Sequence, residues 1–292
     1  MMDIRDKAYI EPEDVTRLNF LRNDPPYGFR RHYRQGLRSH ILEALHPDRL
    51  AEEKTGVVID DVRRFPKAVP VKMLRIFRKR FDSRHEALEE IVKYRILLSF
   101  LPAGSFAVSD EFLVSYRIPG AWDTLLCGWQ EYVVGKSLDP WQMTDADFLP
   151  RFFEVMRTDR RFMNRRSTDE LIRRFQRHTA DLVDGIKAMI RTAGYIPDLA
   201  GVGNLLVTPD GRPKLVDINN ITPVFVSSEI RVDDKGYPVC DKSIEVVSIL
   251  EACLPGRAVS ENDPVYSPFL DPERRNDVRA LEEQFYKSLA SI

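Results

Sequence analysis

The chain has 292 residues, of which 43% are hydrophobic and 30% charged, and its formal net charge is −1. This composition predicts a globular protein with a sizeable core, and the near-zero net charge argues against a nucleic-acid partner. No stretch approaches the roughly eighteen consecutive apolar residues of a membrane-spanning helix, and the three cysteines have no metal-binding spacing, so we expect a cytoplasmic protein without a membrane span.

The first part of the chain predicts an irregular N-terminal arm followed by mixed elements. The arm covers residues 1–27. In residues 30–45, RRHYRQGLRSHILEAL, an apolar residue recurs at every fourth position from Tyr33, and this spacing predicts a helix. Residues 56–65 and 69–81 combine apolar residues with exposed-type polar and basic ones, which predicts two strands.

A helix and two further strands are expected next. Ser83 followed by Glu86 has the spacing of a capping box and predicts that a helix begins there and runs to about residue 100. Strands are then expected over residues 111–117 and 124–133. The sequence up to residue 133 therefore predicts a small group of strands with one central helix.

The remainder of the chain is predicted to be mainly helical. Ser167 and Glu170 form a second capping-box spacing, and the residues that follow carry an apolar stripe typical of a core helix. Helices are expected over residues 145–157, 168–193, 241–254 and 271–289.

The segment 195–221, YIPDLAGVGNLLVTPDGRPKLVDINNI, carries the polar residues of greatest chemical interest. Its Asp-Gly turn between two apolar runs predicts a tight hairpin with strands over 205–208 and 214–216. Such a hairpin brings Asn204 and Asp217 together at one end, with Asp198 just upstream. An Asn and an Asp beside another Asp provide the oxygen ligands that Mg²⁺ prefers.

This segment resembles the catalytic core of the protein-kinase-like fold, including the small-molecule kinases related to aminoglycoside phosphotransferases. The resemblance implies an α+β, bilobal fold, with a small antiparallel-sheet N-lobe over residues 1–133, including the arm, and a larger helical C-lobe over 134–292. By the same resemblance Asp198 is the catalytic base, and Asn204 and Asp217 are the metal ligands.

The resemblance has departures from the family pattern. Ile196-Pro197 stands where the family has a His, the step from Asp198 to Asn204 is six residues rather than five, and the metal motif reads Asp-Ile-Asn from Asp217. Glycines in the loop are expected to absorb the extra residue. A glycine-rich loop over the phosphates is expected before the strands of the N-lobe. No G-x-G-x-x-G is present, and Gly56 is the one candidate found for such a loop.

Phosphate and adenine anchors are expected in the N-lobe. The family has a basic residue on its third strand, paired with a glutamate on the following helix. Arg75 and Lys72 are both candidates for the basic residue, with Arg75 slightly preferred. Glu90 is the first candidate for the glutamate, ahead of its neighbours at 89 and 86. The piece QEYVVGKSLDPW resembles the family's hinge, which implies that the backbones near Glu131 and Val133 hydrogen-bond an adenine edge.

Two functions follow from the resemblance. The first is a phosphotransferase that uses ATP and Mg²⁺, or Mn²⁺, to phosphorylate the hydroxyl group of an unidentified small molecule or protein. The chain after Asp217 lacks an A-P-E segment, which favours a small-molecule acceptor. The second is a catalytically inactive pseudokinase that binds a nucleotide or a partner protein, and it is motivated by the departures listed above.

Overall fold

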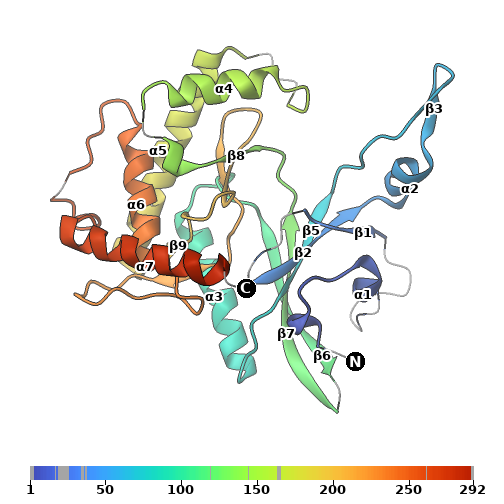
Figure 1. Cartoon of the computed structure of the whole chain (residues 1–292), viewed down its shortest axis with the longest axis horizontal. Coiled ribbons are helices and arrows are strands. Elements are labelled where there is room, and N and C mark those ends of the chain that lie inside the picture. Colours follow the sequence, from blue (N-terminus) through green and yellow to red (C-terminus); the bar gives the residue numbers. More distant parts are fainter. Residues whose placement is uncertain are drawn as a thin grey trace. The chain divides into compact units, whose positions relative to one another are not determined.

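The computed structural model describes residues 3–16, 18, 26–33, 36, 38–118, 120–143, 145–162, 166–260 and 262–290 (Figure 1). The chain divides into two compact units. Unit 1 contains Met1–Val92 and Val108–Tyr132, and unit 2 contains Lys93–Ala107 and Val133–Ile292. The mixed α+β class with antiparallel sheets that the sequence predicts is confirmed. None of the helices in the described ranges has the length and apolar character needed to cross a membrane.

Unit 1 is built around a five-stranded antiparallel sheet with the order β1-β2-β5-β7-β6. Along the chain, the helix α3 lies between β5 and β6. The division between the two units falls after Val92, so the second part of α3 belongs to unit 2. The elements that begin in this unit are η1 (Ile4–Asp6), α1 (Pro12–Thr16), β1 (Gly28–Arg31), β2 (Ser39–Leu45), α2 (Pro47–Thr55), β3 (Val57–Ile59), β4 (Val62–Arg64), β5 (Lys72–Phe77), α3 (Arg84–Phe100), β6 (Ser109–Ile118) and β7 (Ala121–Glu131).

The two faces of this sheet are covered by different parts of the chain. On one face, Leu74 and Ile76 of β5 pack with Ile4 and Ile10 of the N-terminal segment. On the other face, Phe77 packs with residues of α3. The predicted irregular N-terminal arm contains two short helices, η1 and α1, and its other described residues form neither helix nor strand. Apolar side chains fold this segment onto the sheet. Residues 17 and 19–25 of that prediction lie outside the described part.

The helix predicted over residues 30–45 is also wrong. The described residues of this range form β1 and β2, which pair antiparallel with Gly28 opposite Leu45. β2 lies between β1 and β5 and is buried on both faces, so its apolar residues need not alternate with polar ones. A near-continuous apolar run of this kind can match a helical spacing by chance. Residues 34, 35 and 37 are outside the described ranges.

The strand predicted over 56–65 is a hairpin rather than one strand. Asp60 and Asp61 both have positive φ, at 51° and 60°, which turns the chain in two residues and pairs Ile59 with Val62. Gly56 ends α2 as its C-cap, with φ at +76°. The strand predicted over 69–81 is shortened to β5, and its pairing with β2 and β7 places it at the centre of the sheet.

The helix predicted from Ser83 is confirmed as α3. The Ser83 hydroxyl accepts the Glu86 N–H at 3.2 Å, and the Glu86 carboxylate accepts the Asp82 N–H at 2.9 Å. The last two predicted strands of this unit are confirmed as β6 and β7, each slightly longer than expected.

Unit 2 is mainly helical and has two small antiparallel sheets, with the orders β11-β10-β8 and β12-β9. Its further elements are β8 (Lys136–Leu138), η2 (Pro140–Gln142), α4 (Phe148–Thr158), α5 (Thr168–Ala193), β9 (Tyr195–Pro197), β10 (Leu205–Val207), β11 (Pro213–Leu215), β12 (Ile221–Pro223), α6 (Val239–Ala252) and α7 (Pro272–Ala290).

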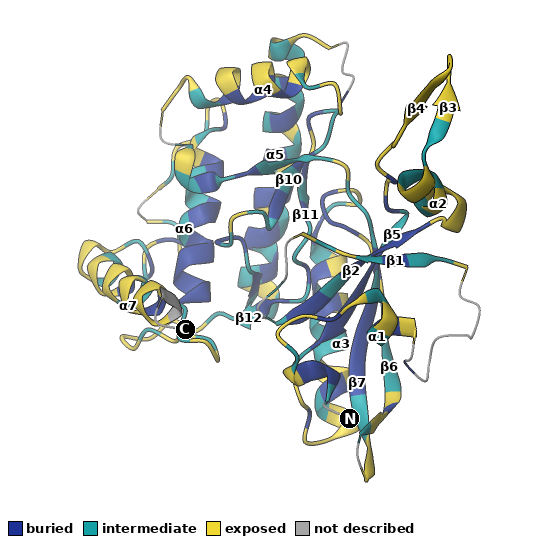
Figure 2. Cartoon of the chain, turned by 45° about the vertical axis from the view of Figure 1, so that its right-hand side comes forward, coloured by how far each residue is buried: buried dark blue, intermediate teal, exposed yellow. Residues whose placement is uncertain are grey.

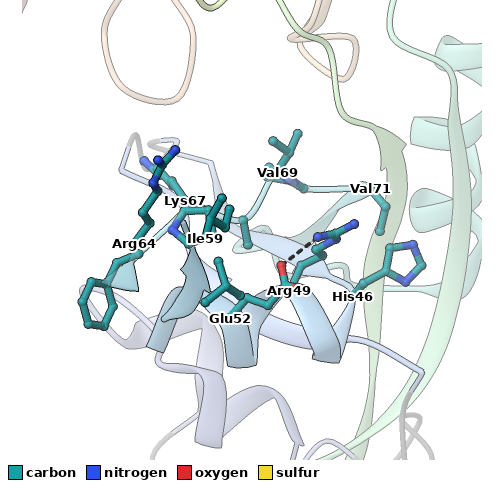
Figure 3. Close-up of a pocket in the computed structure, with 13 residues that line it drawn as sticks. His46, Arg49, Glu52, Ile59, Arg64, Lys67, Val69 and Val71 are labelled. Atoms are coloured by element: carbon teal, nitrogen blue, oxygen red, sulfur yellow. Dashed lines mark hydrogen bonds and ion pairs between the residues drawn. The ribbon is translucent and has the colours of Figure 1, made fainter. Parts of the chain in front are cut away.

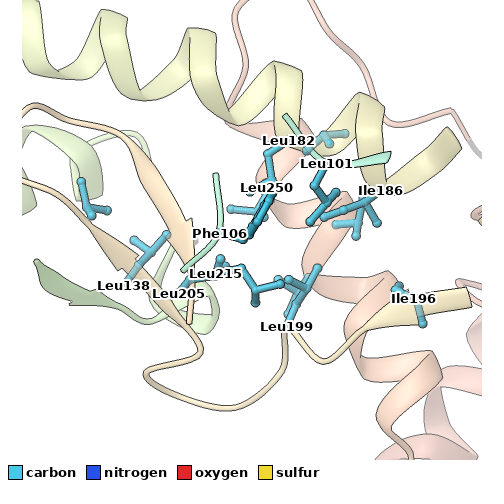
Figure 4. Packing of buried hydrophobic residues seen from close by; sticks show 14 of the residues in the cluster. Leu101, Phe106, Leu138, Leu182, Ile186, Ile196, Leu199, Leu205, Leu215 and Leu250 are labelled. Carbon is cyan, nitrogen blue, oxygen red and sulfur yellow. The ribbon is translucent and has the colours of Figure 1, made fainter. Parts of the chain in front are cut away.

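The core of unit 2 forms around α5 and α6. α5 has the bounds that the sequence predicts. It begins after Ser167, whose hydroxyl accepts the Glu170 N–H, and it ends at Gly194 in the left-handed conformation. Figure 2 shows α6 buried along most of its length, whereas α7 exposes much of its surface. Figure 4 shows how apolar side chains of both helices pack against the strands; those labelled are Leu101, Phe106, Leu138, Leu182, Ile186, Ile196, Leu199, Leu205, Leu215 and Leu250.

Candidate active site

The predicted hairpin of segment 195–221 is present in unit 2. β10 and β11 pair antiparallel, with Leu205 opposite Leu215, and β8 pairs with the other edge of β10. At the turn, Gly211 has φ at +84°, a conformation that favours glycine. Arg174 of α5 donates hydrogen bonds to the carbonyl and the carboxylate of Asp210, at 2.7 and 3.1 Å. The turn is therefore attached to the longest helix of the unit.

The open end of the hairpin brings the predicted metal ligands together. The Val216 N–H donates to the Asn204 carbonyl at 2.8 Å, which extends the ladder by one step beyond Leu205 and Leu215. Asp217 comes directly after this step. Asn204 and Asp217 therefore lie at the same end of the hairpin, as the sequence predicts.

Asp198 follows β9 and is held by hydrogen bonds to both carboxylate oxygens. Its Oδ1 accepts the Ala200 N–H at 3.0 Å, and its Oδ2 accepts the Asn220 side-chain Nδ2–H at 2.8 Å. The Asp198 N–H also donates to the Asn220 carbonyl at 2.8 Å, continuing the pairing of β9 with β12. Asn220 thus positions the carboxylate through both its backbone and its side chain.

The carboxyl group of Asp198 has a perturbed pKa. Burial and the nearby negative charge of Asp217 raise the pKa of Asp198 to about 6, against the opposing effect of the hydrogen bonds from Asn220 and Ala200. A buried carboxyl group beside a second carboxylate is typical of sites that bind a cation or transfer protons. The Asn204 side chain bonds to the Asp198 carbonyl, and Asp217 follows the residue paired with Asn204, so Asp198 and Asp217 lie close together.

The loop between Asp198 and Asn204 fixes the orientation of the Asn204 amide. Its Nδ2 donates to the Asp198 carbonyl at 3.1 Å, and its Oδ1 accepts no hydrogen bond from any described residue. A Cβ on Gly201 would lie 2.7 Å from this Nδ2 and 2.9 Å from this Oδ1. Gly203 has φ at +97°. The two glycines thus accommodate the longer step from Asp198, as expected.

Replacing Gly201 with Ala should displace the Asn204 amide, because the added methyl group would overlap it. Since groups that orient metal ligands typically contribute 10- to 100-fold to metal affinity, we expect metal-dependent nucleotide binding to weaken by about that factor. Titration calorimetry with ATP and Mg²⁺ would measure the change. Gly256→Ala is the control, because an added Cβ there meets no atom within 4 Å, although its φ of +73° makes the substitution more strained than at Gly201. Equal binding by both variants would contradict the role given to Gly201.

Two side chains from other elements form hydrogen bonds with the backbone of the loop that follows Asp198. The Trp141 Nε1–H donates to the Ala200 carbonyl at 3.1 Å, and the Leu199 N–H donates to the hydroxyl of Ser243 on α6 at 3.1 Å. Asp241, in the first turn of α6, pairs with Arg274 of α7.

A cluster of polar and aromatic side chains from η2, the residue Tyr237 before α6, α6 and α7 lies near Asp198. The Tyr237 hydroxyl donates to Glu282 at 2.9 Å, and Lys242 lies 3.1 Å from the same carboxylate. The Lys242 Nζ also lies 3.9 Å from the centre of the Trp141 ring. Burial, Glu282 and the charge of Asp198 all raise the pKa of Tyr237 above its usual range. This cluster therefore connects α7 to the loop that carries Asp198.

The structure places the two candidate basic residues on opposite faces of the sheet in unit 1. Arg75 lies on the face that α3 covers. It is buried, and donates to the Gln130 side chain at 3.1 Å. Lys72 shares the face of Leu74 and Ile76, because side chains alternate along a strand. Arg75, but not Lys72, therefore shares the face of the sheet on which Phe77 packs with α3.

The predicted glutamate partner pairs with a different basic residue. Glu90 lies 2.8 Å from Lys79, and Glu86 lies 3.1 Å from the same amine. The register also aligns Arg75 with Gly128, and Gly128 with Glu111 of β6. A Cβ added to Gly128 would lie 2.8 Å from the Glu111 carboxylate. Because glycine has no Cβ, the Glu111 carboxylate can occupy the space above Gly128 on β7. The sequence alone gave no reason to consider Glu111.

The backbone at Glu131, where the predicted hinge begins, is joined to the segment that leads into β6. Its N–H donates to the Val108 carbonyl at 2.7 Å, and its carboxylate accepts the Val108 N–H at 3.2 Å. This bond occupies the Glu131 N–H, and the contact of the backbone near Glu131 and Val133 with an adenine edge stays a prediction. The backbone of Val133 forms no hydrogen bond with any described residue.

The oxygen ligands present fit a Mg²⁺ ion better than a softer metal. Among the described residues no group of three His, Cys, Asp or Glu side chains could hold a metal ion. Mg²⁺ takes few protein ligands and keeps sites for water and phosphate oxygens, so the Asn204 Oδ1 and the Asp217 carboxylate are sufficient. The buried Oδ1 of Asn219 also lacks a hydrogen-bond partner in the described part of the chain.

In comparisons with known proteins, no family model matches this sequence, and no curated protein matches it.

Proposed function

We propose that this protein is a kinase-like phosphotransferase that uses ATP and Mg²⁺, or Mn²⁺, to phosphorylate a hydroxyl group. The observation that carries the proposal is the arrangement of Asp198, Asn204 and Asp217 in one loop and hairpin. Asp198 is held through both oxygens, and its pKa responds to Asp217. Asn204 is anchored to the Asp198 backbone with its own oxygen facing no internal donor.

Each of these residues has a role in phosphoryl transfer. Asn204 and Asp217 would hold the metal ion, which when bound neutralises charge on the phosphates. The acceptor oxygen attacks the γ-phosphorus, the bond to the β–γ bridging oxygen breaks, and the acceptor proton passes to Asp198. Because this reaction depends mainly on positioning and charge stabilisation, a fixed carboxylate and a fixed amide are well suited to it.

Unit 1 supports the same proposal at the level of fold. Its antiparallel sheet has a helix between the third and fourth strands of the five, and Arg75 on the third strand lies on the helix-covered face. These are the positions of the phosphate-orienting residue and its helix in kinases. We accordingly assign unit 1 to the smaller lobe of a bilobal kinase-like fold and unit 2 to the larger one.

The cysteines agree with a cytoplasmic location, where ATP and Mg²⁺ are available. Cys127, Cys240 and Cys253 are all free thiols, and the first two are buried. Burial raises the pKa of Cys240 and of Cys253 to about 12, which keeps both thiols protonated and unreactive at neutral pH.

A pseudokinase is the second candidate function. It is favoured by the engagement of Arg75 with Gln130 and by the internal hydrogen bond of the Glu131 N–H. Both groups would otherwise serve the nucleotide. The two candidates differ in one measurable property, because only the phosphotransferase transfers phosphate to an acceptor.

Replacing Asp217 with Ala should remove the metal-dependent part of nucleotide binding, because one of two protein ligands is lost. We expect ATP with Mg²⁺ to raise the melting temperature of the wild type by mass action and to leave the variant unchanged. A thermal-shift assay with ATP or GTP, each with and without Mg²⁺ or Mn²⁺, measures this. The control is Asp277→Ala, which removes an exposed carboxylate on α7.

Each outcome of this assay bears on one candidate. An equal metal-dependent shift in the wild type and in Asp217→Ala would contradict the proposed metal site. A shift in the wild type without any transfer of labelled γ-phosphate to sugars, aminoglycosides or protein hydroxyls would favour the pseudokinase.

A further inference from the structure

Unit 1 contains a hollow of about 880 Å³ that the proposed phosphotransfer does not use. It lies between α2, the β3–β4 hairpin and the extended segment that leads into β5. Figure 3 shows Arg64, Ile59 and Lys67 on one side of it and His46 and Val71 on the other. Its volume is within the range of sites that bind ligands of moderate size.

The walls of the hollow are held in place by specific bonds. The Glu53 carboxylate of α2 accepts the Ala68 N–H at 2.6 Å and pairs with Arg30 of β1. Arg30 in turn donates to the Ala68 carbonyl at 2.9 Å. Ala68 is buried, so the extended segment is fixed to α2 and β1 at this residue. Lys67 and Val69, on either side of it, are both exposed.

Several apolar side chains are exposed around the hollow. Ile59, Val62, Phe65 and Val69 are each between 45% and 63% exposed. α2 contains no buried residue, and an isolated two-stranded hairpin is only marginally stable in water. Contiguous exposed apolar residues typically mark a contact surface for another macromolecule.

The charges that line the hollow are mainly positive. Lys67 forms no ion pair with a described residue, and the Arg64 guanidinium is 3.8 Å from its nearest carboxylate, that of Asp60. Glu52 is the single acidic residue that lines the hollow, and it is paired with Arg49 at 2.7 Å. This excess of positive charge is complementary to an acidic partner. The tip of the hairpin carries Asp60 and the adjacent Asp61, which argues against insertion into an anionic membrane.

We propose that this hollow binds an extended peptide segment of a partner protein, in which acidic and apolar residues alternate. The apolar side chains would pack against Val57, Ile59 and Val69, and the carboxylates would pair with Arg64 and Lys67. This inference is independent of the phosphotransfer proposed above, because it uses none of the residues assigned to it.

Fluorescence anisotropy with short labelled peptides tests the proposal. The set consists of peptides in which Glu or Asp alternates with Leu, Val or Phe, and of matched peptides with Lys in place of the acidic residues. We expect the acidic peptides alone to bind the full-length protein, more weakly as salt increases. The double variant Arg64→Glu with Lys67→Glu should bind them at least about tenfold more weakly, because attraction becomes repulsion.

A matched control separates this effect from a general change in charge. Arg84→Glu with Arg117→Glu makes the same change at exposed positions of unit 1 outside the hollow, and should bind like the wild type. Val69→Ser should weaken binding through the apolar contact without altering charge. Melting temperatures of all variants show that they are folded.

Three results would overturn the proposal. One is that no acidic peptide binds, or that acidic and basic peptides bind equally. Another is that the double variant and its control bind equally. The third is that another occupant takes the surface in place of the peptides, seen as self-association that the double variant abolishes, or as binding to phosphatidylserine vesicles but not to phosphatidylcholine vesicles.

Discussion

Asp198→Asn should reduce phosphoryl transfer by about 10²- to 10⁴-fold, which is the usual contribution of a general base. The variant should still bind ATP with Mg²⁺, since Asn204 and Asp217 are unchanged. An amide at this position can still accept the Ala200 N–H. Rotation of the Asn220 amide would supply an acceptor for the new NH₂ group, so the loop should keep its conformation. Labelled γ-phosphate transfer and nucleotide titration, run on the same preparation, separate the two effects.

The pH dependence of the wild type gives a second test of the same residue. Because the pKa of Asp198 is raised to about 6, transfer should decline as the pH falls below that value and the base becomes protonated. Unchanged transfer in Asp198→Asn, or a wild-type rate that is flat across this range, would contradict its role as the base.

As the pH rises through the pKa of Asp198, the free energy of unfolding should fall while the rate of transfer increases. A carboxyl group whose pKa is higher in the folded than in the unfolded state binds more protons when folded, so it destabilises the fold as the pH rises. For Asp198 this cost should develop between its usual value of 3.8 and about 6 and be complete above that. Metal-free Asp198→Asn should therefore be more stable than the wild type above pH 6, and urea unfolding at several pH values would show it.

Lys187→Ala should lower the free energy of unfolding by about 3–5 kcal/mol, which is the usual effect of removing one partner from a buried ion pair. The Lys187 amine in α5 lies 2.8 Å from Glu251 and 2.7 Å from Asp263, and all three side chains are largely buried. The Tyr266 hydroxyl also donates to Glu251, at 2.5 Å. Without the lysine, the Glu251 carboxylate would remain buried with the Arg257 guanidinium 3.6 Å away, and that guanidinium is already held by two hydrogen bonds to Asp184.

Urea unfolding measures this loss, and two variants serve as comparisons. Arg166→Ala removes an exposed pair with Glu170 on the same helix and should have little effect. Lys187→Met with Glu251→Gln removes both charges and should recover part of the stability. If Lys187→Ala were as stable as Arg166→Ala, the buried network would not contribute as proposed.

The elements that could be predicted from the sequence are those specified by local signals. α3 and α5 each begin at a serine whose hydroxyl caps the helix, and α5 has a long apolar stripe. The hairpin of β10 and β11 is specified by its Asp-Gly turn. In these cases neighbouring residues are sufficient to determine the structure, so no knowledge of distant contacts is needed.

The elements that could not be predicted depend on contacts between distant residues. β2 is a strand because the sheet and its coverings bury it on both sides, and that environment comes from the N-terminal segment, β1 and β5. The two supports of the candidate base are similarly distant. Asn220 is 22 residues from Asp198, and Ser243 is 44 residues from Leu199. The one local signal for Asn220 is that it directly follows the metal motif Asp-Ile-Asn, which ends at Asn219.

The attachment of the hairpin at both of its ends has an energetic consequence for the proposed reaction. Arg174 ties its turn to α5, and the Asn204 amide ties its open end to the backbone of Asp198. A hairpin fixed at both ends has few conformations to lose when charged phosphates arrive. Little reorganisation energy is then spent on aligning the oxygen ligands, and more of the interaction energy remains for lowering the barrier to transfer.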